Sequence, residues 1–395
     1  MNPFTFQLRT TIHYGEGRSE HLFKDVEHLA ASDTVVLVTD ATLRKLGLID
    51  PIVQDLSQYG KDVYVYDGIA GEPKTTHIDE VASLLIEKES TLVIGVGGGS
   101  AIDTAKTAAL VASGEHGAAT YALGAHPFPD KRVYCVGVPT TAGTGAEVTS
   151  TTIYADEDGR KLWAWDEQMA PELAILDPLL TTQLPAQLTA ATSIDAIVHA
   201  IEACTGQNEN PMIEAVSLQA ISMLARSLPV ALHQPEDEKA RGELLMGSTL
   251  AGVAIEHGGT GLAHCIGHAL GSVASIPHGR SVAIGLYHSY EHNLSSGKTA
   301  VFSEIARALG VHGDSLTEEE RAAAGATAFR SLVESTPISL TVEEDGLTED
   351  DFDTLRTSLE AEENAPMKKN NCYLPSEEEL TSITRQILVA SPIVG

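Results

Sequence analysis

The spacing of apolar residues changes near residue 185, and this change restricts the possible folds more than any other feature of the sequence. Before it, short β-branched runs alternate with stretches of helical spacing. Uninterrupted apolar runs flanked by helices are typical of strands covered on both faces of a parallel sheet. The runs are Val35–Asp40, Asp62–Gly68, Thr91–Ser100 and Val133–Thr141. The first half therefore predicts an α/β domain with a parallel sheet.

After Leu184 and Pro185 the strand-like runs disappear, and long segments of helical spacing replace them. The clearest are residues 188–206 and 212–228. A chain of 395 residues is also too long for one ordinary core, at about 150 residues per domain. We therefore predict an α/β domain over residues 1–185 and an all-helical domain over residues 186–395.

The chain has a formal net charge of -30, because Asp and Glu total 55 whereas Lys and Arg total 25. Such a surface repels nucleic acid and anionic membranes, so we expect neither as a partner. Acidic runs such as Glu318–Glu320 and Glu343–Asp345 fit adaptation to high salt, and they fit an ordinary soluble acidic enzyme about as well. Both interpretations stay open.

The four cysteines lie far apart and form no Cys-x-x-Cys pair, which argues against a disulfide framework and against a thiolate zinc site. The N-terminus lacks the basic start and long apolar run of a signal peptide. No window reaches the ~20 apolar residues that a membrane span needs. We therefore expect a soluble, unprocessed protein in the reducing cytoplasm.

A glycine-rich turn, Gly95–Ser100, ends one apolar run and leads into the helical stretch AIDTAKTAALVA. Glycines let a backbone approach a diphosphate closely, and the start of a helix adds free N–H donors and a favourable dipole. The turn is therefore a candidate pyrophosphate cradle. The alternative, a simple tight connection between a strand and a helix, is less favoured but stays open, because one glycine-rich turn is a weak signal.

Asp40 closes the first apolar run, where a carboxylate can accept hydrogen bonds from the adenosine ribose and repel a 2′-phosphate, which favours NAD over NADP. The alternative is that it caps the next helix. Asp40 also precedes the glycines by over fifty residues, whereas the usual dinucleotide fingerprint has its acid about twenty residues after them. An ordinary Rossmann domain is therefore not indicated.

A second turn, Pro139–Gly145, follows another strand-like run and holds three threonine hydroxyls among small residues. Hydroxyl and amide groups at the carboxyl edge of a sheet suit a phosphate or the nicotinamide amide. Taken alone, this turn is a polar loop.

In the helical half, Asp195 and His199 are four residues apart, so both project from one helix face. His264 and His268 repeat this spacing, and His278 follows. A core seldom tolerates so many polar groups without partners, and a metal ion would satisfy them. The mixture of imidazole and carboxylate suits Fe(II), Zn, Mn or Ni, and the lack of cysteine argues against a purely structural zinc site.

A single histidine is more often a hydrogen-bonded core or surface residue than a ligand, and only the grouping reverses this expectation. The spacing leaves open which of His264 and His268 is a ligand, since a pair four apart can supply both. We interpret His257, His288 and His292 as structural or exposed, because they belong to no such pattern.

With these elements in this order, the chain resembles the iron-containing (group III) alcohol dehydrogenase family. The resemblance is carried by four segments, GGGSAIDTAK, PTTAGTGAEVTS, AILDPLLTTQLPAQLTAATSIDAIVHAIEA and GLAHCIGHALGSVASIPHG. It implies a dehydroquinate synthase-like fold, with a Rossmann-like α/β dinucleotide-binding domain followed by an all-α domain that holds the metal and the substrate.

Carried over residue by residue, the resemblance implies a metal ion held by four ligands, Asp195, His199, His264 and His278. His268 would then line the substrate pocket as a catalytic residue and not as a ligand. The implied NAD-binding residues are Asp40, Gly97, Gly98, Gly99, Ser100, Asp103, Thr140, Thr141, Thr144 and Lys161. The implied metal is Fe(II) in first place and Zn in second.

The resemblance implies an NAD-dependent alcohol dehydrogenase or aldehyde reductase, in which the metal acts as a Lewis acid and hydride passes to or from the nicotinamide. We expect His268 to relay the alcohol proton, because imidazole titrates near neutral pH. Family members are commonly dimers or larger, so a homo-oligomer is expected.

The sequence departs from the family pattern at two places; the first is a small change in turn rigidity, and the second affects the expected substrate. Ala101 replaces the proline that usually follows GGGS, and Cys372-Tyr373 stand where many members carry the Pro-Arg of an Asn-Pro-Arg element. Lys368, Lys369 and Arg280 are candidate contacts for an anionic phosphonate or sulfonate aldehyde, although solvated surface charges are the more frequent case.

Two other classes of protein compete with the dehydrogenase. One is a sugar-phosphate lyase of the dehydroquinate synthase type, which would need several basic residues around a phosphate, whereas Ala, Gly and Ile surround the ligand set. The other is a non-catalytic scaffold, which the complete set of ligands beside a complete cofactor turn disfavours.

Overall fold

The computed structural model describes residues 3–313 and 315–389, and the chain divides into two compact units. One is Gln7–Gln183, and the other runs from Leu184 onward. Residues 3–6 belong with the second unit, where the Phe6 ring lies 4.4 Å from the His257 ring between centroids. Nothing in the sequence indicated that the N-terminus joins the helical unit.

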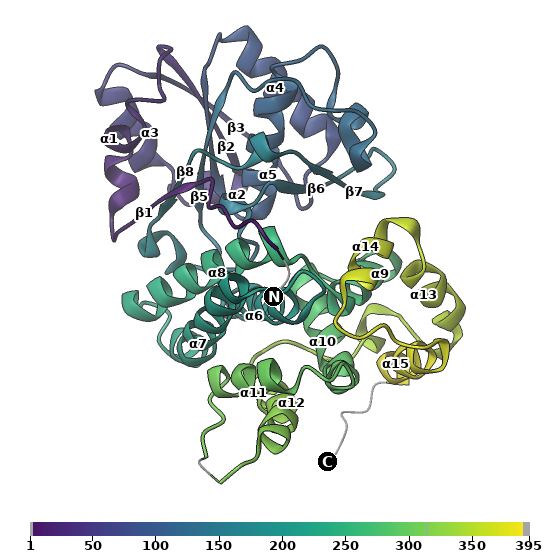
Figure 1. Ribbon diagram of the computed structural model, residues 1–395. Helices are drawn as coiled ribbons and strands as arrows, with labels where there is room; N and C mark the ends of the chain where they lie inside the picture. Colours follow the sequence, from purple (N-terminus) through teal and green to yellow (C-terminus); the bar gives the residue numbers. More distant parts are fainter. Residues whose placement is uncertain (1–2, 314, 390–395) are drawn as a thin grey trace. The chain divides into compact units, whose positions relative to one another are not determined.

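The first unit is built on a six-stranded sheet in which every neighbouring pair is parallel (Figure 1). Its strands are β1 (Thr11–Tyr14), β2 (Thr34–Asp40), β3 (Asp62–Ile69), β4 (Leu92–Gly97), β5 (Tyr134–Pro139) and β8 (Leu173–Leu176). Their order across the sheet is β1-β8-β5-β4-β2-β3. The helices of this unit are α1 (Phe23–Val26), α2 (Ala41–Lys45), α3 (Asp50–Gln58), α4 (Thr75–Glu87) and α5 (Gly99–Val111).

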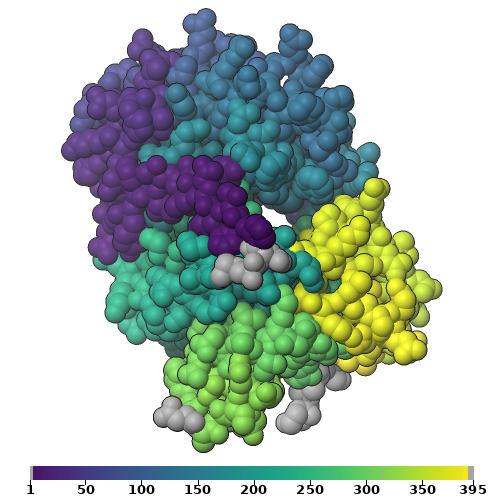
Figure 2. All heavy atoms as spheres, viewed as in Figure 1, coloured from purple at the N-terminus to yellow at the C-terminus, as the bar shows by residue number. Residues whose placement is uncertain are grey.

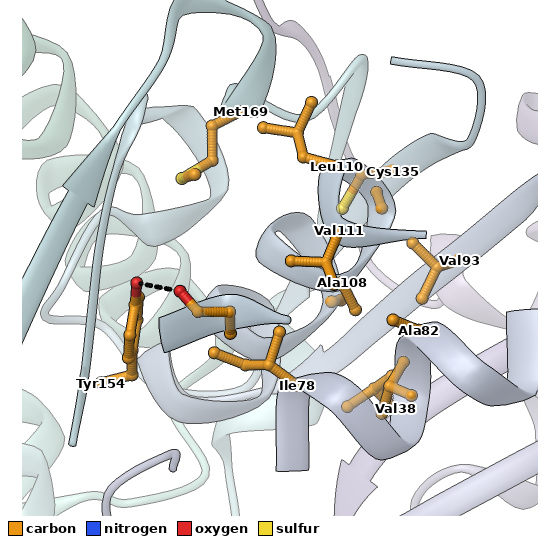
Figure 3. Close-up of a cluster of buried hydrophobic side chains, with 14 of the residues drawn as sticks. Val38, Ile78, Ala82, Val93, Ala108, Leu110, Val111, Cys135, Tyr154 and Met169 are labelled. Atoms are coloured by element: carbon orange, nitrogen blue, oxygen red, sulfur yellow. Dashed lines mark hydrogen bonds between the residues drawn. The ribbon is translucent and has the colours of Figure 1, made fainter. Parts of the chain in front are cut away.

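Both faces of this sheet are buried, which explains the uninterrupted apolar runs. Along β2, Val36 and Val38 belong to a cluster with side chains of α4 and α5, whereas Val35 and Leu37 belong to a cluster with α1 and α3. Figure 3 shows the first cluster, at whose margin the Tyr154 hydroxyl donates a hydrogen bond to the Ala118 carbonyl, 3.2 Å away.

The direction of the connections reverses between β2 and β4, which lie side by side. From β2 the chain continues to β3 on one side, and from β4 it continues to β5 on the other. In open α/β sheets, ligands bind outside the carboxyl ends of the strands at such a switch point. Asp40 and Gly97, the last residues of these two strands, both lie there.

A separate antiparallel hairpin, β6 (Thr151–Ala155) and β7 (Lys161–Trp165), completes the unit. It is attached to α5, because the Ile153 N–H donates a hydrogen bond to Asp103 Oδ2 at 3.1 Å. The hairpin therefore places Lys161 within the α/β unit.

The second unit is helical throughout its described residues, apart from turns and short 3-10 segments. Its helices are α6 (Ala186–Thr205), α7 (Pro211–His233), α8 (Glu238–Gly258), α9 (Leu262–Ala274), α10 (His278–Leu294), α11 (Thr299–Ala308), α12 (Glu318–Glu334), α13 (Phe352–Leu359), α14 (Ala365–Asn370) and α15 (Glu377–Val389). The predicted fold class, an α/β domain with a parallel sheet followed by an all-α domain, is confirmed.

Residues 352–389, yellow in Figure 2, form one continuous part of the surface shown there. Leu355 and Leu359 of α13 and Leu380 and Ile383 of α15 share a buried cluster with α9. The C-terminal helices therefore support the helix that carries His264.

One helix, α7, is long and apolar enough to pass a test for a membrane span, with a mean hydropathy of 1.4 over 18 residues. Helix α7 contains no continuous apolar run of about 20 residues, because polar residues such as Gln219 and Arg226 interrupt its apolar ones. Ile213, Ile221 and Leu224 are buried on one side of α7, and core helices of soluble proteins pass the same test. A single helix of this kind is weak support for a membrane span.

Candidate functional site

The glycine-rich turn joins β4 to α5 with very little space around its backbone. Gly97 has φ +157°, and a Cβ there would lie 2.8 Å from the Cβ of Ala101. A Cβ on Gly99 would lie 2.8 Å from Thr144 Cγ2. Gly98, the N-cap residue of α5, has no side chain with which to cap the first N–H groups of the helix. The turn therefore has the close backbone and available donors that a diphosphate needs.

The threonine turn lies directly beside the glycine turn. The Thr140 N–H donates a hydrogen bond to the Gly97 carbonyl at 2.9 Å, and Thr144 packs against Gly99. Lys106, which is fully buried, holds the end of this turn by donating to the carbonyl oxygens of Ala146 and Thr149, each at 3.1 Å. The structure thus brings together the two turns that the sequence predicted separately.

Asp40 is half-buried and caps α2, because its Oδ1 accepts hydrogen bonds from the N–H groups of Thr42 and Leu43 at 2.8 and 3.0 Å. The capping interpretation is therefore what the structure displays. The residue also ends β2 at the switch point of the sheet, next to the strand that ends in the glycine turn. A ribose contact through the same carboxylate stays a prediction.

Two other predicted nucleotide residues make ion pairs inside the α/β unit. Asp103 lies 3.1 Å from Lys106 Nζ; burial raises the pKa of its carboxyl, although Lys106 opposes this. Lys161, on β7, lies 2.6 Å from Glu72 Oε1. A contact with a nucleotide would require each residue to share or exchange these partners, so their roles stay predictions.

The predicted ligands converge from three helices of the second unit. Asp195 and His199 lie one turn apart on α6, His264 lies in the first turn of α9, and His278 is the first residue of α10, directly after Pro277. Asp195 Oδ1 lies 3.5 Å from His264 Nε2, 3.7 Å from His278 Nε2 and 3.8 Å from His199 Nε2. One donor atom from each of the four residues lies within 4.8 Å of the others.

These distances fit one divalent cation. Four tetrahedral donors at about 2.0–2.2 Å from a zinc-sized ion would lie about 3.4 Å from one another. Asp195 and His264 are each 2% exposed, and neither Asp195 Oδ1 nor His264 Nε2 has a hydrogen-bond partner among the described residues. Because buried polar atoms nearly always have a partner, the site has the properties expected of a metal centre.

The protonation behaviour of the cluster points the same way. Burial alone would raise the pKa of Asp195, but the imidazoles of His199, His278 and His264 outweigh it and hold this pKa well below its usual range. Burial also disfavours the imidazolium form of His264, but Glu202 and Asp195 outweigh it and raise the pKa of His264 to about 9. The cluster favours positive charge at its centre, which a bound cation would supply.

Glu202 is a residue of the site that the sequence analysis missed. Its buried carboxylate lies 2.6 Å from Nδ1 of His264, on the side of the ring opposite the Nε2 that faces Asp195. Glu202 follows Asp195 by seven positions and His199 by three, so helical spacing places all three on one face. This spacing was the signal that could have identified it.

His268 lies one turn after His264 on α9 and is half-buried. Its ring centroid is 5.5 Å from that of His278. It is absent from the group of four converging donors, Asp195, His199, His264 and His278. The geometry thus separates His264 from His268, which the spacing alone left open, although the catalytic role of His268 stays a prediction.

Arg280, a candidate contact for an anionic substrate or a solvated surface charge, is instead buried and bound to other residues of the chain. It is 8% exposed, and its guanidinium donates to the carbonyl oxygens of Ser339 and Thr341 and pairs with Glu344 and Asp345. Arg280 therefore ties α10 to the segment that follows α12.

Comparison with known proteins gives matches to both units. Residues 9–178 match the iron-containing alcohol dehydrogenase family, and residues 189–388 match the Fe-containing alcohol dehydrogenase family, C-terminal. Choline dehydrogenase of Bacillus subtilis (strain 168) is 33% identical over 354 residues, which cover 89% of this chain and 87% of that protein. NAD-dependent methanol dehydrogenase of Bacillus methanolicus is 32% identical over 342 residues, which cover 86% and 89%.

A crystal structure of 1,3-propanediol oxidoreductase superposes with a TM-score of 0.89 at 29% identity, covering 98% of this chain and all of that one. The matches span the glycine turn, the threonine turn and the four converging donors. The chain therefore belongs to the iron-containing alcohol dehydrogenase family, whose members are oxidoreductases that act on alcohols or aldehydes with NAD and a divalent metal.

Proposed function

We propose that this protein is an NAD-preferring dehydrogenase of small alcohols and aldehydes that carry no negative charge, with Asp195, His199, His264 and His278 as its metal ligands. The observation that carries the proposal is the convergence of three Nε2 atoms on Asp195 Oδ1 at 3.5–3.8 Å. Three imidazoles and one carboxylate suit both Fe(II) and Zn, and we rank Fe(II) first because the chain belongs to the iron-containing family. Mass spectrometry of the purified protein would identify the ion.

When bound, the divalent metal supplies a Lewis acid that polarises the substrate oxygen, and NAD supplies the acceptor of the hydride. The alcohol must also lose its hydroxyl proton. We assign this proton to a ring nitrogen of His268, which is half-buried beside His278 and can pass it on to solvent. During aldehyde reduction the same nitrogen returns a proton to the substrate oxygen.

The nucleotide is held by the α/β unit in this proposal. The first amides of α5 and the backbone of Gly97–Gly99 would bind the pyrophosphate, and the hydroxyls of Ser100, Thr140, Thr141 and Thr144 would add donors around it. Asp40 would disfavour NADP, because its carboxylate repels a 2′-phosphate at the carboxyl end of β2.

Several features support a small substrate without negative charge. The relatives named above act, by their names, on choline, methanol and 1,3-propanediol. Arg280 is fully engaged in internal contacts, so it gives no support to a phosphonate or sulfonate aldehyde. The sugar-phosphate lyase gains no support either, since the side chain behind His264 is the carboxylate of Glu202, which would repel a phosphate, and Arg280 is engaged in ion pairs.

We also propose a cytoplasmic location and assembly into a homodimer or a larger homo-oligomer. The four cysteines are free thiols, three of them buried, as expected for a reducing compartment. Light scattering of the purified protein would give the mass of the assembly.

The test of the proposed function is turnover with a panel of short alcohols, diols and aldehydes, after removal of the metal and separate reloading with Fe(II) or Zn. NAD and NADP are compared on each substrate. Turnover that returns when metal is added, and that is faster with NAD than with NADP, supports the proposal. The rates with Fe(II) and with Zn rank the two metals. A protein that binds metal and nucleotide but turns over no alcohol or aldehyde would instead support the lyase or the scaffold.

A further inference from the structure

We propose that Glu202 is a positioning residue of the metal site, which fixes the ring of His264 and the start of the helix that carries it. The proposal rests on the ligand set proposed above. Glu202 lies on α6 with its side chain 1% exposed, so its charge depends on the partners that surround it.

Those partners all belong to the start of α9. Glu202 Oε1 accepts a hydrogen bond from the Ala263 N–H at 2.6 Å, and Oε2 accepts one from the Gly261 N–H at 2.8 Å. Oε2 also lies 2.6 Å from His264 Nδ1. One carboxylate thus binds two otherwise unpaired N–H groups of a helix start together with the side chain of a ligand.

The contact with Nδ1 determines which nitrogen of His264 can bind a metal. An ionised carboxylate only accepts hydrogen bonds, so Nδ1 carries a hydrogen toward Glu202, and Nε2 is the nitrogen left to bind a metal ion, which displaces any proton there. That Nε2 is the atom facing Asp195 Oδ1 at 3.5 Å. A carboxylate that accepts a hydrogen bond from a ligating imidazole fixes the orientation of the ring and raises the basicity of its other nitrogen. Glu202 therefore makes His264 a stronger ligand.

Glu202 and Asn371 both approach the backbone here so closely that residue 261 has no room for a side chain. A Cβ on Gly261 would lie 3.0 Å from Glu202 Oε1 and 2.7 Å from Asn371 Oδ1. Asn371 Oδ1 accepts a hydrogen bond from the Leu262 N–H at 3.0 Å, so it caps the same helix start. The hydrogen bonds of the Asn371 side chain are with the Leu262 amide, Asn293 and the Tyr373 carbonyl, so it serves as a matched control for helix anchoring without imidazole contact.

The experiment measures the Co(II) and Zn(II) dissociation constants of the metal-free full-length protein by competition with a chelator. The variants are Glu202→Gln, Asn371→Ala, His264→Ala and the double variant of Glu202→Gln with His264→Ala. We expect Glu202→Gln to weaken binding about 10- to 100-fold, as is typical for loss of a partner behind a ligand, and to shift the Co(II) absorption bands. Asn371→Ala should change the affinity by less than about 3-fold and leave the bands in place.

In the His264→Ala background, Glu202→Gln should have no further effect, because the two residues then act through one contact. Equal losses for Glu202→Gln and Asn371→Ala would overturn the proposal, since Glu202 would then only anchor α9. Wild-type affinity and an unchanged spectrum for Glu202→Gln would overturn it too. If instead His264→Ala binds metal as tightly as the wild type, the ligand set itself is wrong, which is a distinguishable outcome.

Glu202→Asp provides a second variant should Glu202→Gln fail to fold. The shorter side chain keeps the charge but cannot reach both the amides and Nδ1 in the same way. We expect an intermediate loss of affinity, and wild-type affinity together with an unchanged Co(II) spectrum would overturn the proposal. Thermal unfolding with excess chelator measures the stability of each metal-free variant, so a loss of metal affinity that results only from destabilisation of the fold can be recognised.

Discussion

Three polar residues on one face of α6 show how an apolar helix can carry charge into a core. Asp195 and His199 face the centre of the donor cluster, and Glu202, one turn later, faces the start of α9. Each residue is at most 5% exposed. A buried charge is stable only when it is paired. Glu202 has hydrogen-bond partners at the start of α9, whereas Asp195 Oδ1 lies 3.5 Å or more from the imidazoles and has no hydrogen-bond partner among the described residues, which leaves it for the proposed metal.

At this residue scale the role of His268 can be tested directly. His268→Ala removes the proposed proton acceptor but none of the four converging donors, so turnover should fall by roughly 100-fold, the lower end for general acid–base catalysis. The metal dissociation constant should stay unchanged. His233→Ala, an exposed residue of α7, is the control. Loss of the metal in His268→Ala would show instead that His268 is a ligand.

Asp40 permits a separate test of cofactor choice. Asp40→Asn keeps an oxygen that can cap α2, because asparagine is as good an N-cap as aspartate, but it removes the negative charge. We expect the ratio of kcat/KM for NAD to that for NADP to fall about 10-fold, which corresponds to about 1.4 kcal/mol. The unfolding midpoint should move little. An unchanged ratio would leave Asp40 with its capping role only.

At the scale of elements, the close approach of two turns makes the nucleotide cradle. Gly99→Ala should weaken NAD binding and destabilise the α/β unit by about 1–3 kcal/mol, because the new Cβ would lie 2.8 Å from Thr144 Cγ2. Adding Thr144→Ser removes that methyl and keeps the hydroxyl, so the double variant should recover part of both losses. Calorimetry with NAD and thermal unfolding measure the two effects. A single variant that binds NAD normally would argue against the cradle.

The elements that the sequence predicted are those whose burial leaves a long, regular pattern. The strands β2, β4 and β5 have both faces covered, so each is a continuous apolar run. The helices α6 and α7 have 20 and 23 residues, which is long enough for a clear helical periodicity. The strand β1 and the hairpin of β6 and β7 gave no such signal, because they have four or five residues each. No residue of β1 is buried, and β6 and β7 mix exposed with buried positions. Short elements are specified by their neighbours, which one sequence does not display.

The same limit explains what could be predicted of the candidate site. Spacing identified Asp195 and His199 as neighbours, since both lie on α6, but it left His264 and His268 equivalent. The choice depends on where α10 begins, because its first residue His278 completes the group with His264. The distinction between His264 and His268 therefore depends on contacts between helices. A long-range contact also brings Asn371 to the start of α9, because its partner Leu262 lies 109 positions earlier in the sequence.

At the scale of the whole molecule, the dominant property is the net charge of -30. Acidic runs extend over the helical unit, for example at the start of α12, where Glu318 and Glu319 are exposed beside the capping pair of Thr317 and Glu320. So many like charges destabilise a compact state by repulsion, although they keep the protein in solution. The magnitude of this repulsion depends on how far salt screens it.

We therefore expect the unfolding midpoint to rise with KCl by several degrees between about 0.01 M and 1 M, over which the Debye length falls from about 30 Å to about 3 Å. For a unit of this size, each kcal/mol corresponds to about 2–4 °C. Scans with excess chelator separate the effect from metal binding, and sucrose of equal osmolality controls for exclusion of solutes. An equal rise in sucrose would exclude charge screening as the cause. A midpoint that continues to rise at several molar KCl, where screening is complete, would favour adaptation to high salt over an ordinary acidic surface.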